Sequence, residues 1–554
     1  MHAAHALHRF FAWQRSGMND ARCAAAQVFR RTRVRKVLTK ADSAARTGNG
    51  DPTNIHNNRG EAMSDSHSSN TPDPTRRKIL AALAGSVALS ACGGGGGGGS
   101  SGSTGSTNGI PPDRASLPRP ALPAPATSGI DHIVLVTMEN RSFDHMFGWV
   151  PNAEHQQARQ FTDAFGQTQS SFALTSNDAY GFQACSFSDP NHLYSAGRTH
   201  LANGAMNGFL LTPGTSLMRG DLLPIGYLGA GDLDFYRGAV PQYTVCDYYM
   251  SGILSATFPN RLYLHSGETD RLDDSVDTSS LPTIWDRLDA KSVSSTYYYH
   301  DVPFTALYGT RYVGRSKLFA EFLSDAASGN LPSFCMVDPS FAGEAQGTSN
   351  DDHPHADVRN GQVLLGQIYD ALRTGPKWST TLMILVYDEW GGFMEHAVPP
   401  VKPVSTAEQA VGNDGRLGFR VPCMLFGPRV RANMVSRYPF DPSSIHQLIA
   451  WRFGLDPLGV RASDTSTFNM AYALDFTDAA RTDAPAIAVT QGTFGVACST
   501  AGIIPGLGGV DHSQQVPSTS DAQVASQAAA ANAPGGRFAD LRAKATALGF
   551  PGGM

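Results

Sequence analysis

The sequence lacks several features that would assign it to whole classes of protein. Its 554 residues contain only seven cysteines and no Cys-x-x-Cys pair, which argues against a zinc–thiolate site. No apolar run is long enough for a transmembrane helix, and no internal repeat is visible. The formal net charge of −5 gives no basic excess of the kind that nucleic-acid-binding proteins carry. We therefore expect no zinc finger, no spanning helix and no nucleic-acid partner.

A stretch near the start of the chain resembles an export signal. A twin-arginine pair at 76–77 precedes a short apolar run at 79–89, and LSAC at 89–92 resembles the lipobox of bacterial lipoproteins. Residues 63–92 are therefore predicted to be a twin-arginine lipoprotein signal, with Cys92 as the lipidated residue. This predicts a cell-envelope lipoprotein of the periplasm or outer membrane, held by a lipid anchor, with a secreted form as the alternative.

Composition divides the rest of the chain. Residues 1–62 are rich in Ala and Arg and are interpreted as an over-extended start or a disordered segment, so that Met63 is the expected true start. A Gly/Ser-rich and then Pro-rich stretch after Cys92 is typical of a linker. The predicted organisation is 1–62 start region, 63–92 signal, 93–128 linker, 129–476 catalytic domain and 477–554 C-terminal tail. Among the five cysteines after residue 128, up to two disulfides are allowed, and their pairing is left open.

Two apolar runs, each predicted to be a strand, are followed by side chains of the kind that can bind metal ions. Residues 133–138 and 381–387 are continuously apolar and largely β-branched or aliphatic, as in strands buried on both faces of a parallel sheet. Open α/β sheets place their sites where such strands end. The residues at these two ends are Glu139, Asn140, Asp388 and Glu389. Their oxygen ligands suit one divalent cation, whose identity the sequence leaves unknown.

A candidate nucleophile lies between these strands in the chain. SATFPNR, residues 255–261, follows another predicted strand at 243–246. Threonine is a poor nucleophile by itself, but a metal bound to its oxygen lowers the pKa of the hydroxyl and makes attack feasible. Thr257 is therefore both a candidate nucleophile and a candidate metal ligand. Arg261 is interpreted as an anion ligand or a cap of the turn.

These blocks resemble one known family. ENRSFDH at 139–145, TFPNRLY at 257–263, DDHP at 351–354 and YDEWGGF at 387–393 are similar to motifs of the bacterial phosphoesterase family that includes non-specific phospholipases C and acid phosphatase A. The resemblance extends from about residue 130 to 476. It implies an α/β fold like that of alkaline phosphatase, with a mostly parallel central sheet and helices on both faces.

The resemblance also implies roles for individual residues. Glu139, Asn140, Asp388 and Glu389 would hold the metal, and Thr257 would attack phosphorus to form a phospho-enzyme intermediate. Histidines of the family bind phosphoryl oxygens or protonate the leaving group, and the matching positions are His192, His353 and His396. His355 is an alternative partner histidine. Two departures from the family pattern are Glu395 in place of Asp and Trp390 where many members carry His.

Three functions remain open at this point. The leading hypothesis is an exported metal-dependent phosphoesterase of the phospholipase C type, acting on a phospholipid or another phosphate ester. The alternatives are an acid phosphatase that cleaves phosphomonoesters, and a non-catalytic surface lipoprotein. The complete set of predicted ligands argues against the last of these. The head group, the preference for diester or monoester and the oligomeric state do not follow from the sequence.

Overall fold

The computed structural model describes residues 109–174, 179–185, 187, 189–212, 221–492, 494–495 and 538–552. The predicted signal, Cys92 and most of the linker lie outside the described residues. Within the described ranges, no helix combines the length and the apolar character needed to cross a membrane.

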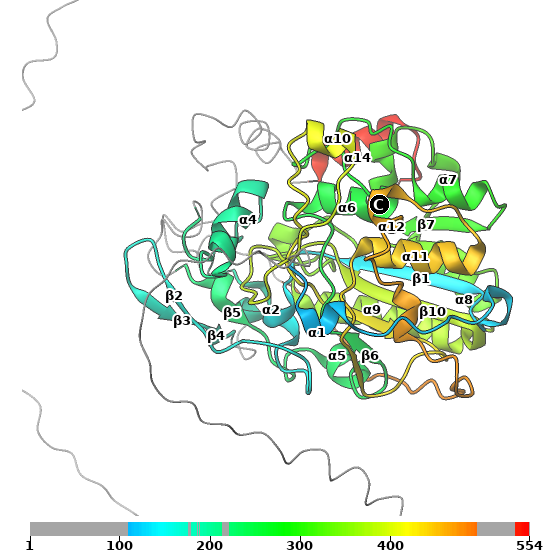
Figure 1. Ribbon diagram of the computed structural model, residues 1–554, viewed down its shortest axis with the longest axis horizontal. Helices are drawn as coiled ribbons and strands as arrows, with labels where there is room; N and C mark the ends of the chain where they lie inside the picture. The colour runs from blue at the N-terminus through cyan, green and yellow to red at the C-terminus, as the bar shows by residue number, and fades with distance from the viewer. Residues whose placement is uncertain are drawn as a thin grey trace, which may run out of the picture. The chain divides into compact units, whose positions relative to one another are not determined.

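A mostly parallel eight-stranded sheet forms the centre of the structure (Figure 1). The strand order is β12-β6-β11-β10-β1-β9-β7-β8. The strands are β1 (His132–Met138), β6 (Thr244–Cys246), β7 (Ser295–Tyr299), β8 (Ser316–Leu318), β9 (Phe334–Val337), β10 (Thr381–Tyr387), β11 (Cys423–Phe426) and β12 (Met434–Ser436). Only β11 runs antiparallel to its neighbours in this sheet. The predicted α/β class with a mostly parallel sheet is confirmed.

Helices cover the sheet in two groups. In one group α6 contacts α7 and α11, and α11 contacts α12. In the other group α9 contacts α3, α5 and α8. Figure 1 shows α6, α11 and α12 above β1, and α5 and α9 below it. The helices are α1 (Pro112–Ala115), α2 (Phe143–Phe147), α3 (Ala179–Gln183), α4 (Tyr194–Leu201), α5 (Asp234–Ala239), α6 (Thr257–Ser266), α7 (Ile284–Asp289), α8 (Phe319–Ser328), α9 (Val358–Thr374), α10 (Thr406–Ala410), α11 (Pro442–Phe453), α12 (Gly459–Ala462) and α14 (Ala539–Ala547).

The two strands predicted from apolar runs lie side by side. β1 and β10 are buried along their whole length, which explains why neither shows the alternation of a half-exposed strand. They pair in parallel from His132 opposite Thr381 to Met138 opposite Tyr387. Because the last paired residues are opposite one another, the segments that follow both strands leave the sheet at the same point.

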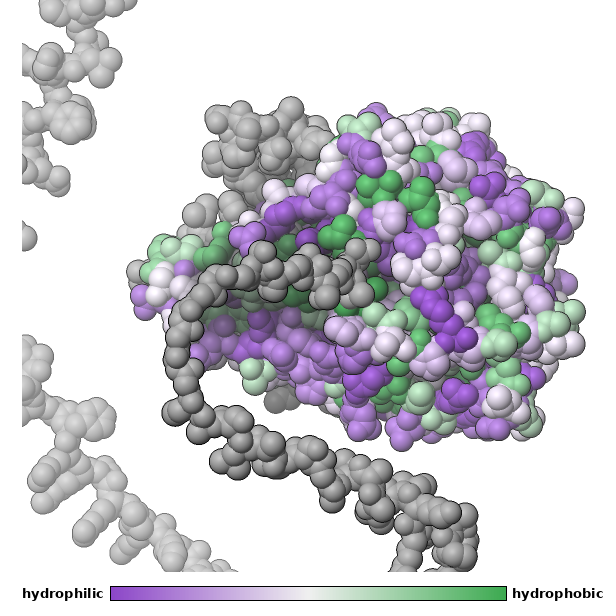
Figure 2. All heavy atoms as spheres, viewed as in Figure 1, coloured by the Kyte–Doolittle hydropathy of each residue, from purple (hydrophilic) through white to green (hydrophobic). Residues whose placement is uncertain are grey.

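A smaller layer extends beyond these strand ends. It contains the hairpin β2 (Gln160–Thr162) and β3 (Thr168–Ser170) and the parallel pair β4 (Phe172–Ala173) and β5 (Gly226–Tyr227). A separate buried apolar cluster lies in this region, and Phe209, Trp390 and Phe419 belong to it. Figure 2 shows a recess on this side of the molecule, with a largely hydrophobic floor between two hydrophilic rims.

The C-terminal helix belongs to the same hydrophobic core as the sheet. The core that contains β1 and β10 also contains Phe538, which precedes α14, Leu541 within it and Phe550, which follows it. Among the described cysteines, Cys185 is disulfide-bonded. Three others are buried free thiols, namely Cys246, Cys335 and Cys423.

Candidate active site

The ends of β1 and β10 bring four candidate ligands together. The Asp388 N–H donates to the carbonyl of Met138 at 3.0 Å, which continues the pairing one residue beyond the two strands. The four residues that follow the strands are each at most 2% exposed: Glu139, Asn140, Asp388 and Glu389. Three carboxylates and one amide thus meet at the carboxyl edge of the sheet, as the apolar runs predict.

Hydrogen bonds between the two turns fix their relative position. The N–H of Asn140 donates to Asp388 Oδ1 at 3.2 Å, and the N–H of Arg141 donates to the carbonyl of Glu389 at 3.1 Å. Asn140 has φ 58°, a left-handed conformation that asparagine tolerates better than most residues. Its side-chain Oδ1 is buried and accepts no hydrogen bond. An oxygen of this kind is available to a cation.

Two glycines allow neighbouring backbone to approach these turns. A Cβ atom at Gly391 would lie 2.1 Å from the Asn140 carbonyl oxygen. A Cβ atom at Gly392 would lie 2.6 Å from Cβ of Pro190 and 2.9 Å from the carbonyl oxygen of Asn191. The Gly-Gly pair after the ligands therefore lets the segment before His192 pack directly on the turn.

We expect Gly391→Ala to destabilise the protein far more than a glycine substitution with the same backbone conformation in open space. Gly391 has φ +61°, so alanine there has both a left-handed backbone and a collision with Asn140. Gly412 has φ +84°, and the nearest atom to its added Cβ is 3.9 Å away. Gly412→Ala should cost only about 1–2 kcal/mol for the backbone conformation. Urea unfolding of both variants measures the difference, and equal losses would show that the close approach is unimportant.

Thr257 is the first residue of α6. The preceding turn is held by Asn260, whose side chain accepts from Ile253 N at 3.0 Å and donates to the carbonyls of Ser255 at 2.8 Å and Ala256 at 3.0 Å. Thr257 Oγ1 donates to Glu139 Oε2 at 3.3 Å, so the predicted nucleophile contacts the predicted ligand set. The positive end of the helix dipole also lies at this hydroxyl.

Arg261, one turn further along α6, carries the positive charge of the site. Its guanidinium donates to Glu139 Oε1 at 2.7 Å, Asp338 Oδ1 at 2.8 Å and Asp388 Oδ2 at 3.4 Å. Burial alone would lower the pKa of Arg261, but these carboxylates raise it above its usual value. Burial raises the pKa of Asp388 well above its usual range, and the charge of Glu139 adds to this while Arg261 opposes it.

The charges of this cluster leave room for a cation. Among the described residues, Arg261 is ion-paired with Glu139, Asp338 and Asp388, and a fourth buried carboxylate, Glu389, directly follows Asp388. Carboxylates held close together in a buried site repel one another, and a divalent ion coordinated by oxygen would reduce that repulsion. Together with the buried Asn140 Oδ1, this donor set fits one hard or borderline divalent cation.

Two of the predicted histidines lie near this cluster: His192 contacts it, and His353 lies beside His192. His192 Nδ1 donates to the Pro190 carbonyl at 2.8 Å, and its Nε2 lies 3.3 Å from Asn140 Nδ2 and 4.0 Å from Glu389 Oε1. The ring of His353 lies 5.8 Å from that of His192. His353 Nε2 is 3.5 Å from Asp189 Oδ2, and its Nδ1 is 3.5 Å from Glu344 Oε2. For the alternative partner His355, burial lowers the pKa.

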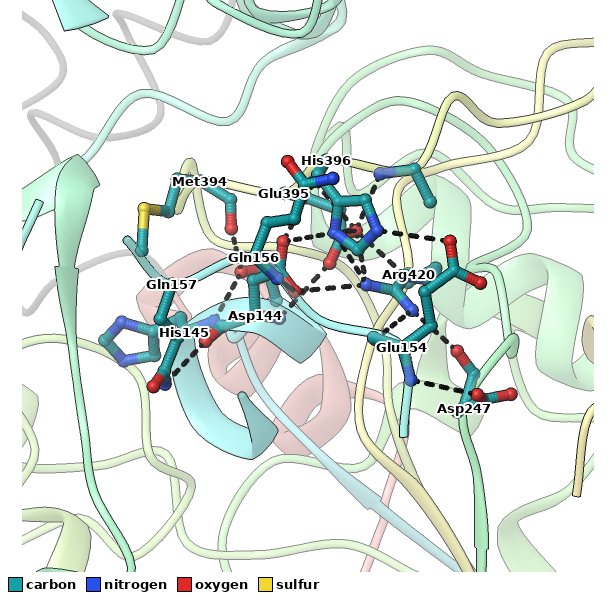
Figure 3. A network of polar contacts seen from close by, with 12 residues as sticks. Asp144, His145, Glu154, Gln156, Gln157, Asp247, Met394, Glu395, His396 and Arg420 are labelled. Carbon is teal, nitrogen blue, oxygen red and sulfur yellow. Dashed lines mark hydrogen bonds and ion pairs between the residues drawn. The ribbon is translucent and has the colours of Figure 1, made fainter. Parts of the chain in front are cut away.

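The structure places His396 in a different polar network (Figure 3). His396 Nδ1 lies 2.6 Å from Asp144 Oδ2, and its Nε2 lies 3.4 Å from Glu154 Oε1. Burial opposes the charged ring, but Asp144 and Glu154 outweigh it and raise the pKa of His396 to about 9. The carboxylate of Asp144 therefore orients the ring of His396.

This second network is also a potential cation site. Asp144, Glu395 and His396 each offer one ligand atom, and these atoms lie within 4.8 Å of one another. Arg420, however, donates to Glu395 Oε1 at 2.8 Å and to Asp144 Oδ1 at 3.1 Å. In addition, Asp144 and Glu154 keep a proton on the His396 ring, and a protonated ring nitrogen cannot bind a cation. The cluster at the ends of β1 and β10 is therefore the better candidate for a metal.

Trp390, one of the departures from the family pattern, points into the small apolar cluster. Its Nε1 donates to His200 Nδ1 at 3.1 Å, and its ring packs edge-on against Phe419. Burial lowers the pKa of His200 to about 3, which keeps this ring neutral and able to accept the bond. The indole thus leaves the neighbouring ligands Asp388 and Glu389 in place.

Asp338 is a site residue that the sequence reasoning missed. It directly follows β9, the strand that pairs with β1 on the side opposite β10. The available signal was the same as for Glu139, an apolar strand followed by a carboxylate, but β9 is only four residues long. Arg261 was noted from the sequence, and its observed partners are carboxylates.

Comparisons with known proteins give consistent matches. The model of a family described as "Phosphoesterase family" matches residues 130–456. Non-specific phospholipase C3 of Arabidopsis thaliana is 29% identical over 364 residues, covering 58% of this chain and 68% of that protein. Phospholipase C A of Mycobacterium tuberculosis is 28% identical over 420 residues, covering 62% of this chain and 78% of that protein. The matched region of non-specific phospholipase C1 of Arabidopsis thaliana is 63% of its length.

A solved structure described as a protein in the alkaline phosphatase superfamily from Vibrio parahaemolyticus also matches. The TM-score is 0.30 at 10% identity, over 62% of this chain and 72% of that chain.

Proposed function

The chain belongs to the phosphoesterase family and is a hydrolase of phosphoester bonds, and from this premise we propose that it is a phosphodiesterase of the phospholipase C type with Thr257 as its nucleophile. The observation that carries the proposal is the contact of Thr257 with a buried carboxylate cluster at the carboxyl edge of the sheet. Curated relatives named as phospholipases C support the diester substrate. The recess with a hydrophobic floor on this side of the molecule suits the diacylglycerol part of a phospholipid.

The chain's own residues account for the movement of protons in two steps. Thr257 Oγ1 passes its proton toward Glu139 Oε2 as a new bond forms between that oxygen and phosphorus. The bond between phosphorus and the diacylglycerol oxygen breaks, and this oxygen takes a proton from a histidine. We assign the donor to His353, because Asp189 and Glu344 on either side favour a protonated ring by their charge. Water then attacks phosphorus and gives a proton to His353, and the bond between phosphorus and Thr257 breaks as Glu139 returns its proton to the threonine oxygen, which restores the Thr257 hydroxyl.

We further propose one resident divalent cation. Glu139, Asn140, Asp388 and Glu389 would hold it, with Thr257 beside it. A bound cation of this kind would stabilise negative charge on the attacking and phosphoryl oxygens. Two observations support this assignment: Asn140 Oδ1 is buried and accepts no hydrogen bond from the described residues, and the buried carboxylates of Glu139, Asp388 and Glu389 lie at the same edge of the sheet.

Activity on two chromogenic esters tests the proposed function. Purified protein should hydrolyse p-nitrophenylphosphorylcholine, a diester, faster than p-nitrophenyl phosphate, a monoester, and a chelator should abolish both activities. The reverse preference would favour the acid phosphatase. Hydrolysis of neither ester, in metal-loaded and folded protein, would favour a non-catalytic lipoprotein.

We propose that the protein is exported and anchored by lipid at Cys92. A single acyl chain holds a protein only marginally, so stable anchoring needs the several chains that lipoprotein processing attaches. Cys92→Ser should therefore shift the protein to an unprocessed or soluble fraction, as measured by membrane fractionation. Wild-type protein found free in the periplasm or medium with an N-terminus beyond residue 92 would refute the lipid anchor, although export would still hold.

A further inference from the structure

The residue that precedes the C-terminal helix packs against Phe258, the residue that follows the candidate nucleophile. The ring centroid of Phe538 lies 4.7 Å from that of Phe341, 5.9 Å from that of Phe304 and 6.1 Å from that of Phe258. Phe304 also contacts Phe258 and Phe341 edge-on, at 5.5 Å and 5.4 Å. These four buried rings form an aromatic box, and one of its members, Phe258, directly follows Thr257 in the chain.

The aromatic box holds the guanidinium that organises the site. The Arg261 guanidinium carbon lies 4.7 Å from the centroid of the Phe304 ring and 5.5 Å from that of Phe341. The edges of the same group bind the carboxylates of Glu139 and Asp388. Contacts with the aromatic faces and with the carboxylates together fix the orientation of the guanidinium. Phe538 packs on both of these rings, so it helps to hold in place the two rings that contact the guanidinium.

Helix α14 also contacts the loop that holds the start of α6. Lys544 Nζ donates to Thr278 Oγ1 at 3.0 Å and to the carbonyl of Val276. Two residues earlier in that loop, Asp274 Oδ1 accepts the N–H of Phe258 at 2.7 Å. The C-terminal segment is therefore connected to the first turn of α6 in two ways: Phe538 packs on Phe258, and Lys544 binds the loop that holds Asp274.

We propose that the C-terminal helix is an internal brace for the catalytic site, and that Phe538 is a positioning residue for Thr257 and Arg261. This inference rests on the proposed function, because it takes Thr257 as the group that attacks phosphorus. Removing the Phe538 ring leaves Phe258, Phe304 and Phe341 without their common neighbour, so that the first turn of α6 gains freedom. A displacement of about 1 Å at a reacting group can cost about a hundredfold in rate.

The test compares two phenylalanines that lie on either side of α14 in the chain. Phe538 and Phe550 are 6% and 7% exposed, and only Phe538 belongs to the aromatic box. In the full-length chain, Phe538→Leu should lower kcat for p-nitrophenylphosphorylcholine at least tenfold, with KM changed less than twofold. Phe550→Leu should lower the melting temperature by a similar amount while kcat stays within twofold of wild type. A merely structural role would not separate kcat in this way.

Either of two results would overturn the brace. One is a kcat within twofold of wild type for folded Phe538→Leu, and the other is an equal loss of kcat in Phe550→Leu. Should Phe538→Leu melt below the assay temperature, Phe538→Met replaces it under the same criteria. Wild-type protein that hydrolyses neither ester would defeat the proposed function first, and the brace would fall with it. Normal wild-type turnover with an unaffected Phe538 variant defeats the brace alone.

Discussion

Replacement of Thr257 by alanine is expected to abolish hydrolysis of phosphate esters while the protein remains folded. Alanine lacks the oxygen that must form the bond to phosphorus, so we expect kcat to fall by about a thousandfold or more. The fold should persist, because alanine is a better helix former than threonine and the hydrogen bond that Thr257 loses to Glu139 is long, at 3.3 Å. Steady-state hydrolysis of p-nitrophenylphosphorylcholine and circular dichroism measure the two effects.

Two matched variants make this result specific. Thr257→Ser keeps a hydroxyl at the same position and should retain most of the activity. Ser266→Ala removes a buried hydroxyl at the other end of α6, where Ser266 Oγ lies 2.7 Å from the Tyr308 hydroxyl, and should leave kcat within twofold. Residual activity of about a tenth of wild type in folded Thr257→Ala would mean that another group attacks phosphorus.

The sheet could be predicted from sequence because its central strands are buried on both faces. Residues 133–138 and 381–387 carry no alternation of polar and apolar side chains, and the structure has β1 at His132–Met138 and β10 at Thr381–Tyr387. The strand predicted at 243–246 is observed as β6, Thr244–Cys246. Since carboxyl ends of parallel strands meet at one edge, the proximity of Glu139 to Asp388 followed from the same reasoning.

Other parts of the site depend on contacts that no local pattern encodes. The network around His396 joins Asp144, Glu154 and Arg420, which come from distant parts of the chain (Figure 3). A motif places His396 beside the Gly-Gly turn, but the direction of its side chain depends on those distant charges. The packing of Phe538 against Phe258 is of the same kind. A long segment rich in small residues precedes Phe538, so its composition indicates a tail rather than part of the core.

Replacement of Glu389 by glutamine is expected to abolish binding of the proposed cation without disturbing the metal-free fold. Glu389 Oε2 accepts the N–H of Gly391 at 2.7 Å, and the glutamine carbonyl can preserve that bond at the same size. The substitution removes one negative charge from the proposed ligands. Wild-type protein should contain about one divalent ion per chain by elemental analysis, and Glu389→Gln should contain much less.

The same variant separates cation binding from folding. A ligand that binds only native protein stabilises it by about 2.7 kcal/mol at a hundred times its Kd. Chelator should therefore lower the melting temperature of wild-type protein, and it should have little effect on Glu389→Gln. His396→Gln is the matched control, because it removes a ligand from the competing cluster of Asp144, Glu395 and His396. If His396→Gln loses the metal and Glu389→Gln keeps it, the cation lies beside Arg420. If metal-free wild-type protein is fully active, the residues at the ends of β1 and β10 are not metal ligands.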